Sequence, residues 1–363
     1  MTNLHALHRD HGQSPWLDNL RRGWITSGEL HRWVDRGIRG ITSNPTIFQR
    51  AMQSGDDYDG DLAELVASGA TIEDAYWSLV THDIVAALDV LAPLHADSDG
   101  HDGYVSVELA PELAHDTGAS VAAANELADR IDRPNLLVKI PATAEGVPAV
   151  RQLVADGRSV NVTLIFSLDR YREVVEAYLG GLERCDGDLS GVTGVASFFV
   201  SRVDTEIDRR LEAIGTERAL ALRGRAAVAQ ARLAYAIFEA AFSGDRWQAL
   251  AARGARPQRP LWASTSTKNP DYPDTLYVDS LIGPNTVNTM PEATLEAFDD
   301  HGTLARTVDD GTEAAARLLD DLAEVGIDVD DATATLEDEG VAAFAKSFDE
   351  LLGTLSDRAD RMT

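Results

Sequence analysis

The feature that most constrains the fold is a regular alternation of short apolar segments with longer helix-like ones. Eight strand-like segments occur between residues 14 and 291, and helical sequence separates them. Strands that alternate with helices favour a parallel sheet with crossover connections, and eight strands close a barrel. The sequence therefore predicts a (β/α)₈ TIM barrel. The expected strands are 14–20, 40–48, 103–111, 135–143, 159–166, 191–202, 259–269 and 276–291, the last holding either a strand or the closing loop.

The segments between these strands carry apolar residues at helical spacing. The acidic segment 303–363 also has an apolar stripe, which includes Leu318, Leu322, Phe344 and Phe348 and is too regular for a free tail. We expect a barrel domain at 1–302 and additional C-terminal helices packed on it at 303–363. The expected helices between strands are 26–37, 56–98, 111–132, 144–156, 167–185 and 203–253, the last interrupted near Gly215.

An open, doubly wound sheet is the alternative fold. It commonly carries a glycine-rich phosphate loop, but neither G-x-G-x-x-G nor G-x-x-x-x-G-K-[ST] occurs in the sequence. The hydrolase and protease patterns G-x-S-x-G and H-E-x-x-H are also absent from it. The barrel is therefore the preferred prediction.

Charge and cysteine content limit the partners and the compartment. The formal net charge is −28, which disfavours binding to nucleic acid because the phosphate backbone would be repelled. The single cysteine, Cys185, cannot form an internal disulfide, so we expect a reducing cytoplasm. We expect no signal peptide and no membrane partner, since charged residues break every apolar run. Either a monomer or a homodimer is compatible with the sequence.

Three histidines in the first residues raise the question of a metal site. His5, His8 and His11 lie in the segment MTNLHALHRDHG, which is polar and precedes the first expected strand. We expect this segment to be a disordered tail and not a set of metal ligands.

A lysine lies inside the fourth expected strand. The segment NLLVKIPAT opens after Pro134 and closes at Pro141, as a buried parallel strand does. Alternation places Lys139 on the face opposite Ile140, away from a solvated edge. Burial favours the neutral amine that a lysine needs to attack a carbonyl and form a Schiff base. The alternative is a structural lysine that reaches water or pairs with a carboxylate.

Polar side chains are also expected on the inward faces of the two neighbouring strands. Glu108 faces inward in the third strand, and the fifth strand should turn Asn161 and Thr163 inward and Leu164 outward. Glu108 and Thr163 would then flank Lys139 from both sides, which suits the proton transfers of Schiff-base chemistry. Alternatively, Glu108 only neutralises the lysine and Thr163 is only a good strand former.

Other polar residues close further strands. Asp18 and Asn44 end the first and second strands, where local turn chemistry is the alternative explanation. Arg202 and Lys268 follow the sixth and seventh strands, and Lys268 lies beside Ser266. Two cations beside a hydroxyl group could clamp a phosphate, although each could instead form a surface salt bridge.

The motifs together resemble those of the transaldolase family over essentially the whole barrel. They are S-N-P-T at 43–46, V-K-I-P-A-T at 138–143, N-V-T-L-I-F at 161–166 and S-F-F-V-S-R at 197–202, in the family's order and approximate spacing. Many members of the family have an arginine in an S-x-R-N context after strand seven, where this chain has Lys268 in S-T-K-N. The motifs W-x-x-T-x-x-K-N at 262–269 and P-N-T-V-N-T-M-P at 284–291 resemble those of the longer bacterial branch of the family.

The resemblance implies a role for each candidate residue. Lys139 would form the Schiff base, Asp18 would be the general acid and base at the sugar C4 hydroxyl, and Glu108 and Thr163 would hold the catalytic water. The residues expected to bind substrate are Asn44, Asn161, Ser197, Phe199, Arg202, Ser266 and Lys268, with Arg202 on the phosphate.

The implied reaction moves a dihydroxyacetone unit from sedoheptulose 7-phosphate or fructose 6-phosphate to an aldose phosphate. It needs neither a metal nor a cofactor, because the lysine iminium is the electron sink. Two other functions stay open: a fructose 6-phosphate aldolase that releases free dihydroxyacetone, and a barrel that binds sugar phosphates without catalysis. The last leaves the grouping of Lys139, Glu108 and Thr163 unexplained.

Overall fold

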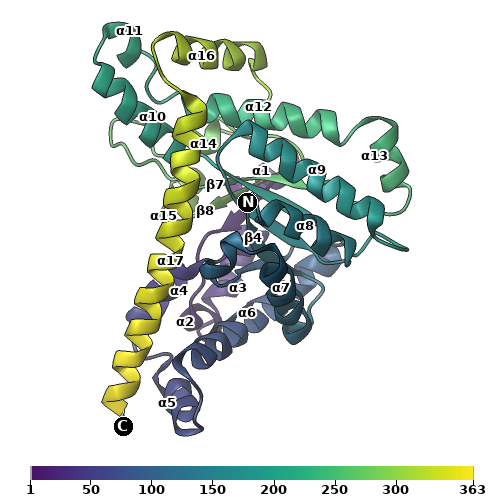
Figure 1. Cartoon of the computed structure of the whole chain (residues 1–363), viewed down its shortest axis with the longest axis vertical. Coiled ribbons are helices and arrows are strands. Elements are labelled where there is room, and N and C mark those ends of the chain that lie inside the picture. The colour runs from purple at the N-terminus through teal and green to yellow at the C-terminus, as the bar shows by residue number, and fades with distance from the viewer. Residues whose placement is uncertain (1, 363) are drawn as a thin grey trace.

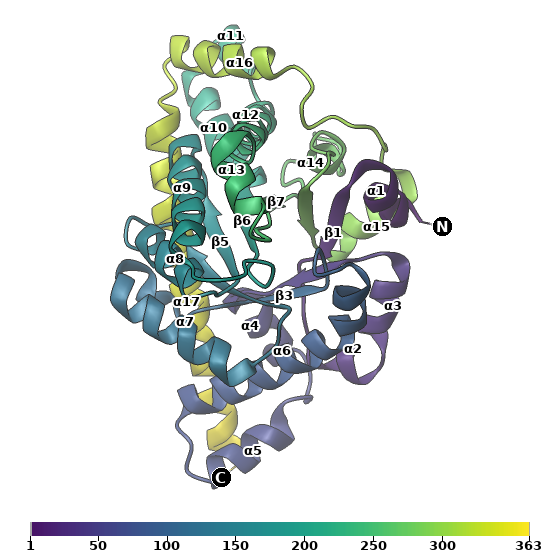
Figure 2. The same ribbon diagram turned by 90° about the vertical axis from the view of Figure 1, so that its right-hand side faces the viewer.

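The computed structural model describes residues 2–362 and contains a closed barrel in which the strands run parallel from β1 to β8 around the ring (Figures 1 and 2). The predicted fold class is thereby confirmed. The strands are β1 (Gln13–Leu17), β2 (Gly40–Thr42), β3 (Tyr104–Glu108), β4 (Leu136–Pro141), β5 (Val160–Ile165), β6 (Gly194–Phe199), β7 (Arg259–Ala263) and β8 (Thr286–Met290).

Helices surround this barrel, and two more follow it at the C-terminal end of the chain. The helices are α1 (Asn3–His11), α2 (Arg22–Thr26), α3 (Glu29–Arg36), α4 (Pro45–Gln53), α5 (Asp59–Ala67), α6 (Ile72–Asp97), the 3₁₀ helix η1 (Pro111–His115), α7 (Thr117–Ile131), α8 (Gly146–Ala155), α9 (Leu168–Arg184), α10 (Ser201–Ile214), α11 (Glu217–Leu220), α12 (Ala226–Ala241), α13 (Gly244–Ala251), α14 (Leu276–Asp279), α15 (Glu292–His301), α16 (Thr312–Glu324) and α17 (Val329–Met362).

The register of the strands follows the predicted alternation at the centre of the site. Glu108 at the end of β3 pairs with Lys139 in β4, and Val107 pairs with Val138. Val107, Val138 and Ile140 are buried and belong to the outer face of the strands. Because side chains alternate along a strand, Glu108 and Lys139 share the inner face. The prediction that Glu108 lies beside Lys139 is confirmed.

Strand β5 departs from the prediction after Thr163. The register with β6 shifts between Val162 and Ile165, and Leu164 has a φ of 60°. A bulge of this kind redirects the side chain. Leu164 packs against Gly340 of α17, where an added Cβ would lie 3.0 Å from Leu164 Cδ2. The regular alternation of the strand is therefore interrupted at Leu164, which still packs on a helix outside the strands.

The second strand is shorter than expected. β2 ends at Thr42, and the residues Pro45 to Phe48 begin α4. Asn44 is the N-cap, with Oδ1 accepting a hydrogen bond from Ile47 N at 3.0 Å, and Pro45 occupies the first helical turn. Both residue types favour a helix start. The apolar residues after Pro45 were therefore wrongly assigned to a strand.

The N-terminal segment is ordered, contrary to our prediction of a disordered tail. Residues Asn3–His11 form α1, which Thr2 caps and in which Leu4 and Leu7 are fully buried. The helix packs on β1 and α15. Its two leucines at a spacing of three supply the apolar face that secures it.

The long helix α17 runs along one side of the molecule, from α16 to the neighbourhood of α5 (Figures 1 and 2). Its strongest packing is against α4 and α10 at the mouth of the barrel. Thr46 and Ser347 are hydrogen-bonded at 2.8 Å, and Arg358 pairs with Asp59 at 2.8 Å. Gly340 allows the helix to approach the bulge in β5. This helix therefore brings residues from the end of the chain to the barrel mouth.

Helix α6 has the length and mean hydropathy of a membrane span, as no other helix does among residues 2–362. Our expectation that charge breaks every apolar run was too simple for this segment. Nine of its residues are buried against the rest of the protein, including Leu79, Ile84 and Leu88. The helix packs on β3, so its apolar face belongs to the barrel core.

Candidate active site

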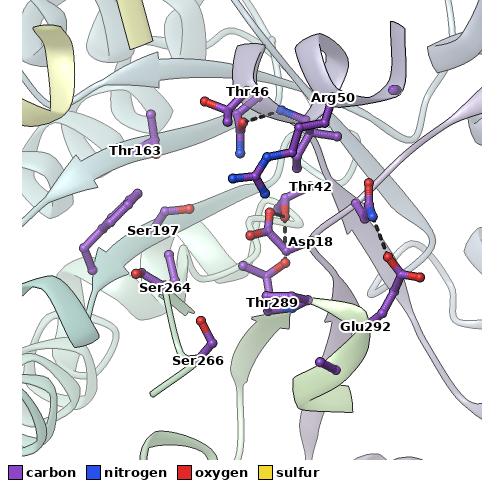
Figure 3. A pocket seen from close by; sticks show the side chains of 18 of the residues that line it. Asp18, Thr42, Thr46, Arg50, Thr163, Ser197, Ser264, Ser266, Thr289 and Glu292 are labelled. Atoms are coloured by element: carbon purple, nitrogen blue, oxygen red, sulfur yellow. Dashed lines mark hydrogen bonds between the residues drawn. The ribbon is translucent and has the colours of Figure 1, made fainter. Parts of the chain in front are cut away.

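A cavity with a volume of about 710 Å³ opens at the carboxyl ends of the barrel strands. Figure 3 shows side chains converging on it from several strands and from α4. In TIM barrels the carboxyl ends of the strands form the end at which catalytic residues gather. Nine of the predicted site residues line this cavity: Asp18, Asn44, Lys139, Thr163, Ser197, Phe199, Arg202, Ser266 and Lys268.

Lys139 lies at the floor of the cavity and is 5% exposed. Its Nζ donates to the carbonyl oxygen of Ser43 at 3.1 Å and to Glu108 Oε2 at 3.4 Å. Burial raises the pKa of the Glu108 carboxyl, and the charge of Lys139 opposes that shift. A lysine held between one carboxylate and one carbonyl, with its end open to a cavity, is positioned to attack a ligand carbonyl.

Glu108 itself does not line the main cavity. It lies beside a small neighbouring pocket whose walls include Leu164, Val341 and Phe344. Glu108 can therefore exchange protons with the amine of Lys139 without contacting the bulk of a ligand.

A hydrogen-bonded chain of side chains crosses the barrel beside Lys139. Asn161 Nδ2 donates to Ser106 Oγ at 3.0 Å, and Ser197 Oγ donates to Asn161 Oδ1 at 2.7 Å. Register places Asn161 directly opposite Lys139 and Thr163 opposite Pro141. We predicted that Thr163 would flank Lys139 on β5. In the observed register Asn161 holds that position, and Thr163 lies one layer closer to the mouth of the barrel.

Thr163 has a hydroxyl group with no fixed partner. Its side chain is fully buried, and Oγ1 makes no hydrogen bond among the described residues. A buried hydroxyl usually has a partner, so an unsatisfied one that faces a cavity is suited to hold water or a ligand hydroxyl.

Asp18 follows β1 on another part of the cavity wall. Thr42 Oγ1 donates to Asp18 Oδ1 at 2.8 Å and is 2.6 Å from Thr289 Oγ1 (Figure 3). Burial raises the pKa of Asp18; the Thr42 hydrogen bond and then the charge of Lys139 oppose this shift. Thr42, itself bonded to Thr289, fixes one carboxylate oxygen, which leaves the other available for proton transfer.

The cations Arg202 and Lys268 lie on a third part of the wall. Arg202 is the second residue of α10, a helix without a side-chain N-cap, so the positive end of the helix dipole adds to its charge. Lys268 Nζ donates to Ser266 Oγ at 2.6 Å. Burial lowers the pKa of both cations. Neither forms an ion pair among residues 2–362, so their charges are available to an anion.

Two aromatic residues, Phe199 and Phe344, contribute to the apolar part of the lining. The ring of Phe199 packs on Phe166 at a centroid distance of 5.0 Å with an interplanar angle of 45°, and the Arg202 guanidinium carbon lies 5.1 Å from the centroid of the Phe199 ring. Phe344 reaches the site from α17, with its ring centroid 6.0 Å from Lys139 Nζ. Phe344 was predicted only as part of an apolar stripe, and no local pattern in the sequence pairs it with Lys139.

Sequence reasoning missed several further lining residues. Thr42 and Thr289 orient Asp18, and Arg50 reaches the cavity from α4. Asn44 and Pro45 are helix-start residues, and a helix predicted to begin there would have carried Arg50 on its second turn, near the mouth of the barrel. Among residues 2–362, no group of three or more His, Cys, Asp and Glu side chains could hold a metal ion.

Comparisons with known proteins agree on one family. A family model described as "Transaldolase/Fructose-6-phosphate aldolase" matches residues 15–355. A protein named "Transaldolase" from Thermobifida fusca is 54% identical over 94% of this chain and 95% of its own length. Proteins of the same name from Saccharopolyspora erythraea and Mycobacterium leprae are 53% and 52% identical, each over 99% of this chain and over 98% and 97% of their own lengths.

Proposed function

The chain belongs to the transaldolase/fructose-6-phosphate aldolase family, and from this premise we propose that its cavity carries out transaldolase chemistry. The enzyme takes a dihydroxyacetone unit from sedoheptulose 7-phosphate or fructose 6-phosphate and transfers it to glyceraldehyde 3-phosphate or erythrose 4-phosphate, as in the pentose phosphate pathway. The observation that carries this proposal is the buried Lys139 beside Glu108, in one cavity with Asp18 and two unpaired cations.

The reaction begins when the amine of Lys139 attacks the C2 carbonyl of the ketose. The resulting carbinolamine loses water to form an iminium ion, and these steps require proton transfers at the C2 oxygen. Glu108 lies 3.4 Å from the amine, and the Thr163 hydroxyl lies closer to the mouth with no fixed partner. We assign them the role of exchanging protons through a water molecule held between them.

Cleavage follows when Asp18 removes the proton from the C4 hydroxyl. The C3–C4 bond breaks, its electrons pass to the iminium to give an enamine on Lys139, and the aldose phosphate departs. The iminium provides the electron sink, so the residues present suffice for this step. Asn44, Asn161 and Ser197 are proposed to bind the hydroxyl groups of the substrate. An acceptor aldehyde then reverses these steps.

The direct test is a coupled assay with fructose 6-phosphate and erythrose 4-phosphate in metal-free buffer. We expect glyceraldehyde 3-phosphate to appear only when both substrates are present. Its release from fructose 6-phosphate alone, at a comparable rate, would show the aldolase function instead.

The phosphate is proposed to bind between Arg202 and Lys268. Arg202→Ala should lower kcat/KM for phosphorylated ketoses, with a loss of transition-state stabilisation of roughly 2–4 kcal/mol. The reason is that an anion in a partly buried site loses a charged hydrogen-bond donor. Most of the loss should appear in KM. Weak turnover of unphosphorylated fructose is the control, and it should barely change. An equal loss with both sugars would indicate a structural role.

Protection of the enamine is proposed to distinguish transfer from release, and Phe344 covers Lys139 on the α17 side. Phe344→Ala should raise the ratio of free dihydroxyacetone release to transfer about tenfold, because water gains access to the enamine carbon. Phe344→Leu keeps an apolar cover and should change the ratio much less. Rates of both reactions with fructose 6-phosphate, with and without erythrose 4-phosphate, give the ratio. An unchanged ratio in the alanine variant would remove Phe344 from this role.

We also propose that the enzyme acts in the cytoplasm, without nucleic acid or membrane partners, as a monomer or homodimer. The single cysteine supports a reducing compartment, and the charge of −28 disfavours nucleic acid as a partner.

A further inference from the structure

Arg50 extends from α4 into the main cavity, and its guanidinium lies on the opposite side from Ser266, the residue that binds Lys268 (Figure 3). The cavity is therefore lined by positive charge on two sides, with Arg50 on one and Lys268 on the other. Arg202 also lines the cavity and follows β6, the strand that pairs with β7, after which Lys268 comes.

The guanidinium of Arg50 has no partner in the part of the chain that the structure describes. Among residues 2–362 it forms no ion pair and no side-chain hydrogen bond. Arg21, which also lines the cavity, differs: its Nη2 is 3.0 Å from Glu292 Oε1, and its guanidinium stacks 4.2 Å from the Trp24 ring. In a chain with a formal charge of −28, an arginine without a carboxylate beside it is available to an external anion.

Lys268 lies within the electrostatic reach of both arginines. Burial lowers the pKa of Lys268; the charge of Arg202 adds to this shift, Asp18 opposes it, and Arg50 lowers the pKa further. Like charges gathered in one cavity raise the energy of the free protein, and a bound anion relieves that repulsion. Lys268 supplies only a point charge, whereas a guanidinium offers two parallel donors to a phosphate group.

We infer that Arg50 is a third cationic ligand of the substrate phosphate, which closes the anion site from the α4 wall opposite Arg202 and Lys268. The inference rests on the proposed function for the identity of the substrate. Binding of the phosphate group itself does not depend on catalysis.

The test compares Arg50→Gln with the native enzyme in two measurements. KM for fructose 6-phosphate and the dissociation constant of inorganic phosphate, measured by calorimetry, should each rise about tenfold, since Arg50 is an exposed ligand and one of three. The kcat should stay within about twofold, and weak turnover of unphosphorylated fructose should not change. Arg50→Lys keeps the positive charge but lacks the two parallel donors of a guanidinium, so it should give an intermediate result.

Arg32→Gln is the matched control. It removes the same charge from α3, where Arg32 pairs with Glu29 and does not line the cavity, and it should leave both constants unchanged. Both measurements are repeated in about 0.5 M KCl, where long-range attraction is screened. An effect of Arg50→Gln that disappears in salt would overturn the assignment in favour of electrostatic steering. Unchanged phosphate binding at low salt would also overturn it.

These outcomes separate the inference from the proposed function. If the native enzyme fails to transfer dihydroxyacetone yet Arg50→Gln weakens phosphate binding, the proposed function fails and the ligand assignment holds. If transfer occurs and phosphate binding is unaffected by Arg50→Gln, only the ligand assignment fails.

Discussion

Lys139→Ala should abolish transfer, with kcat reduced on the order of 10⁴-fold or more, because no other group can form the covalent intermediate. The side chain is buried at the cavity floor, and its hydrogen bonds to Ser43 and Glu108 hold the amine beside the position of a ligand carbonyl. Truncation removes both the nucleophile and the electron sink that the reaction requires. Neither neighbour can replace them.

The covalent intermediate gives a direct measurement of this prediction. Borohydride reduction in the presence of fructose 6-phosphate should leave a three-carbon adduct on Lys139, detected by peptide mass spectrometry. The sequence contains three lysines, so the assignment has only Lys268 and Lys346 as competitors. Lys268→Ala should still give the adduct, although at a higher substrate concentration. An adduct on another lysine, or full activity of Lys139→Ala, would contradict the mechanism.

Lys139→Ala also carries a prediction about the protonation of Glu108 that helps to interpret the loss of activity. The substitution leaves Glu108 buried without its partner, and burial already raises the pKa of that carboxyl. The lost charge opposed this shift, so Glu108 should become protonated more readily in the variant. A Lys139→Met variant keeps the volume of the side chain and controls for packing.

Much of the fold could be predicted from the sequence because a parallel barrel repeats one simple unit. Buried strands show as short apolar runs, and their alternation determines which side chains point inward. Adjacent strands in sequence are adjacent in the barrel, so the sequence alone predicts the pairing of Glu108 with Lys139. The cluster of polar residues at the strand ends follows from the same rule.

The errors arose where one local signal had to be weighed against another. The run after Pro45 is apolar enough for a strand, but Asn44 and Pro45 are helix-start residues, and here they prevail. The segment with His5 and His8 is polar on average, yet Leu4 and Leu7 provide a narrow apolar face that packs on the barrel.

Other features could not have been predicted from local sequence. The bulge at Leu164 depends on the partner strands and on Gly340 of α17, which is far away in the chain. Phe344 and Arg50 meet the site through the packing of α17 and α4, and apolar stripes do not specify which helices will be neighbours. These contacts depend on tertiary packing, which periodicity does not encode.

The remaining prediction separates the roles of the two carboxylates. Asp18→Asn should lower kcat for transfer by about 10³-fold or more while leaving adduct formation intact, because the C4 hydroxyl loses its base after the Schiff base has formed. Thr42 donates to one oxygen of Asp18 and is hydrogen-bonded to Thr289, so an asparagine can keep the same orientation with its carbonyl oxygen. The loss would then reflect proton transfer and not geometry.

Glu108→Gln should instead slow formation of the adduct by about 10²-fold, since it removes a proton acceptor beside the amine. Borohydride trapping at timed intervals measures adduct formation, and release of glyceraldehyde 3-phosphate measures cleavage. With Asp18→Asn, trapping should yield the intact six-carbon sugar on Lys139, because the C3–C4 bond has not broken. With Glu108→Gln, the yield should be low at early times, and the adduct that accumulates should be the three-carbon species. Glu108 contacts the amine, whereas Asp18 lies on the cavity wall. A single defect shared by both variants would therefore show that proton transfer in this site is not divided in this way.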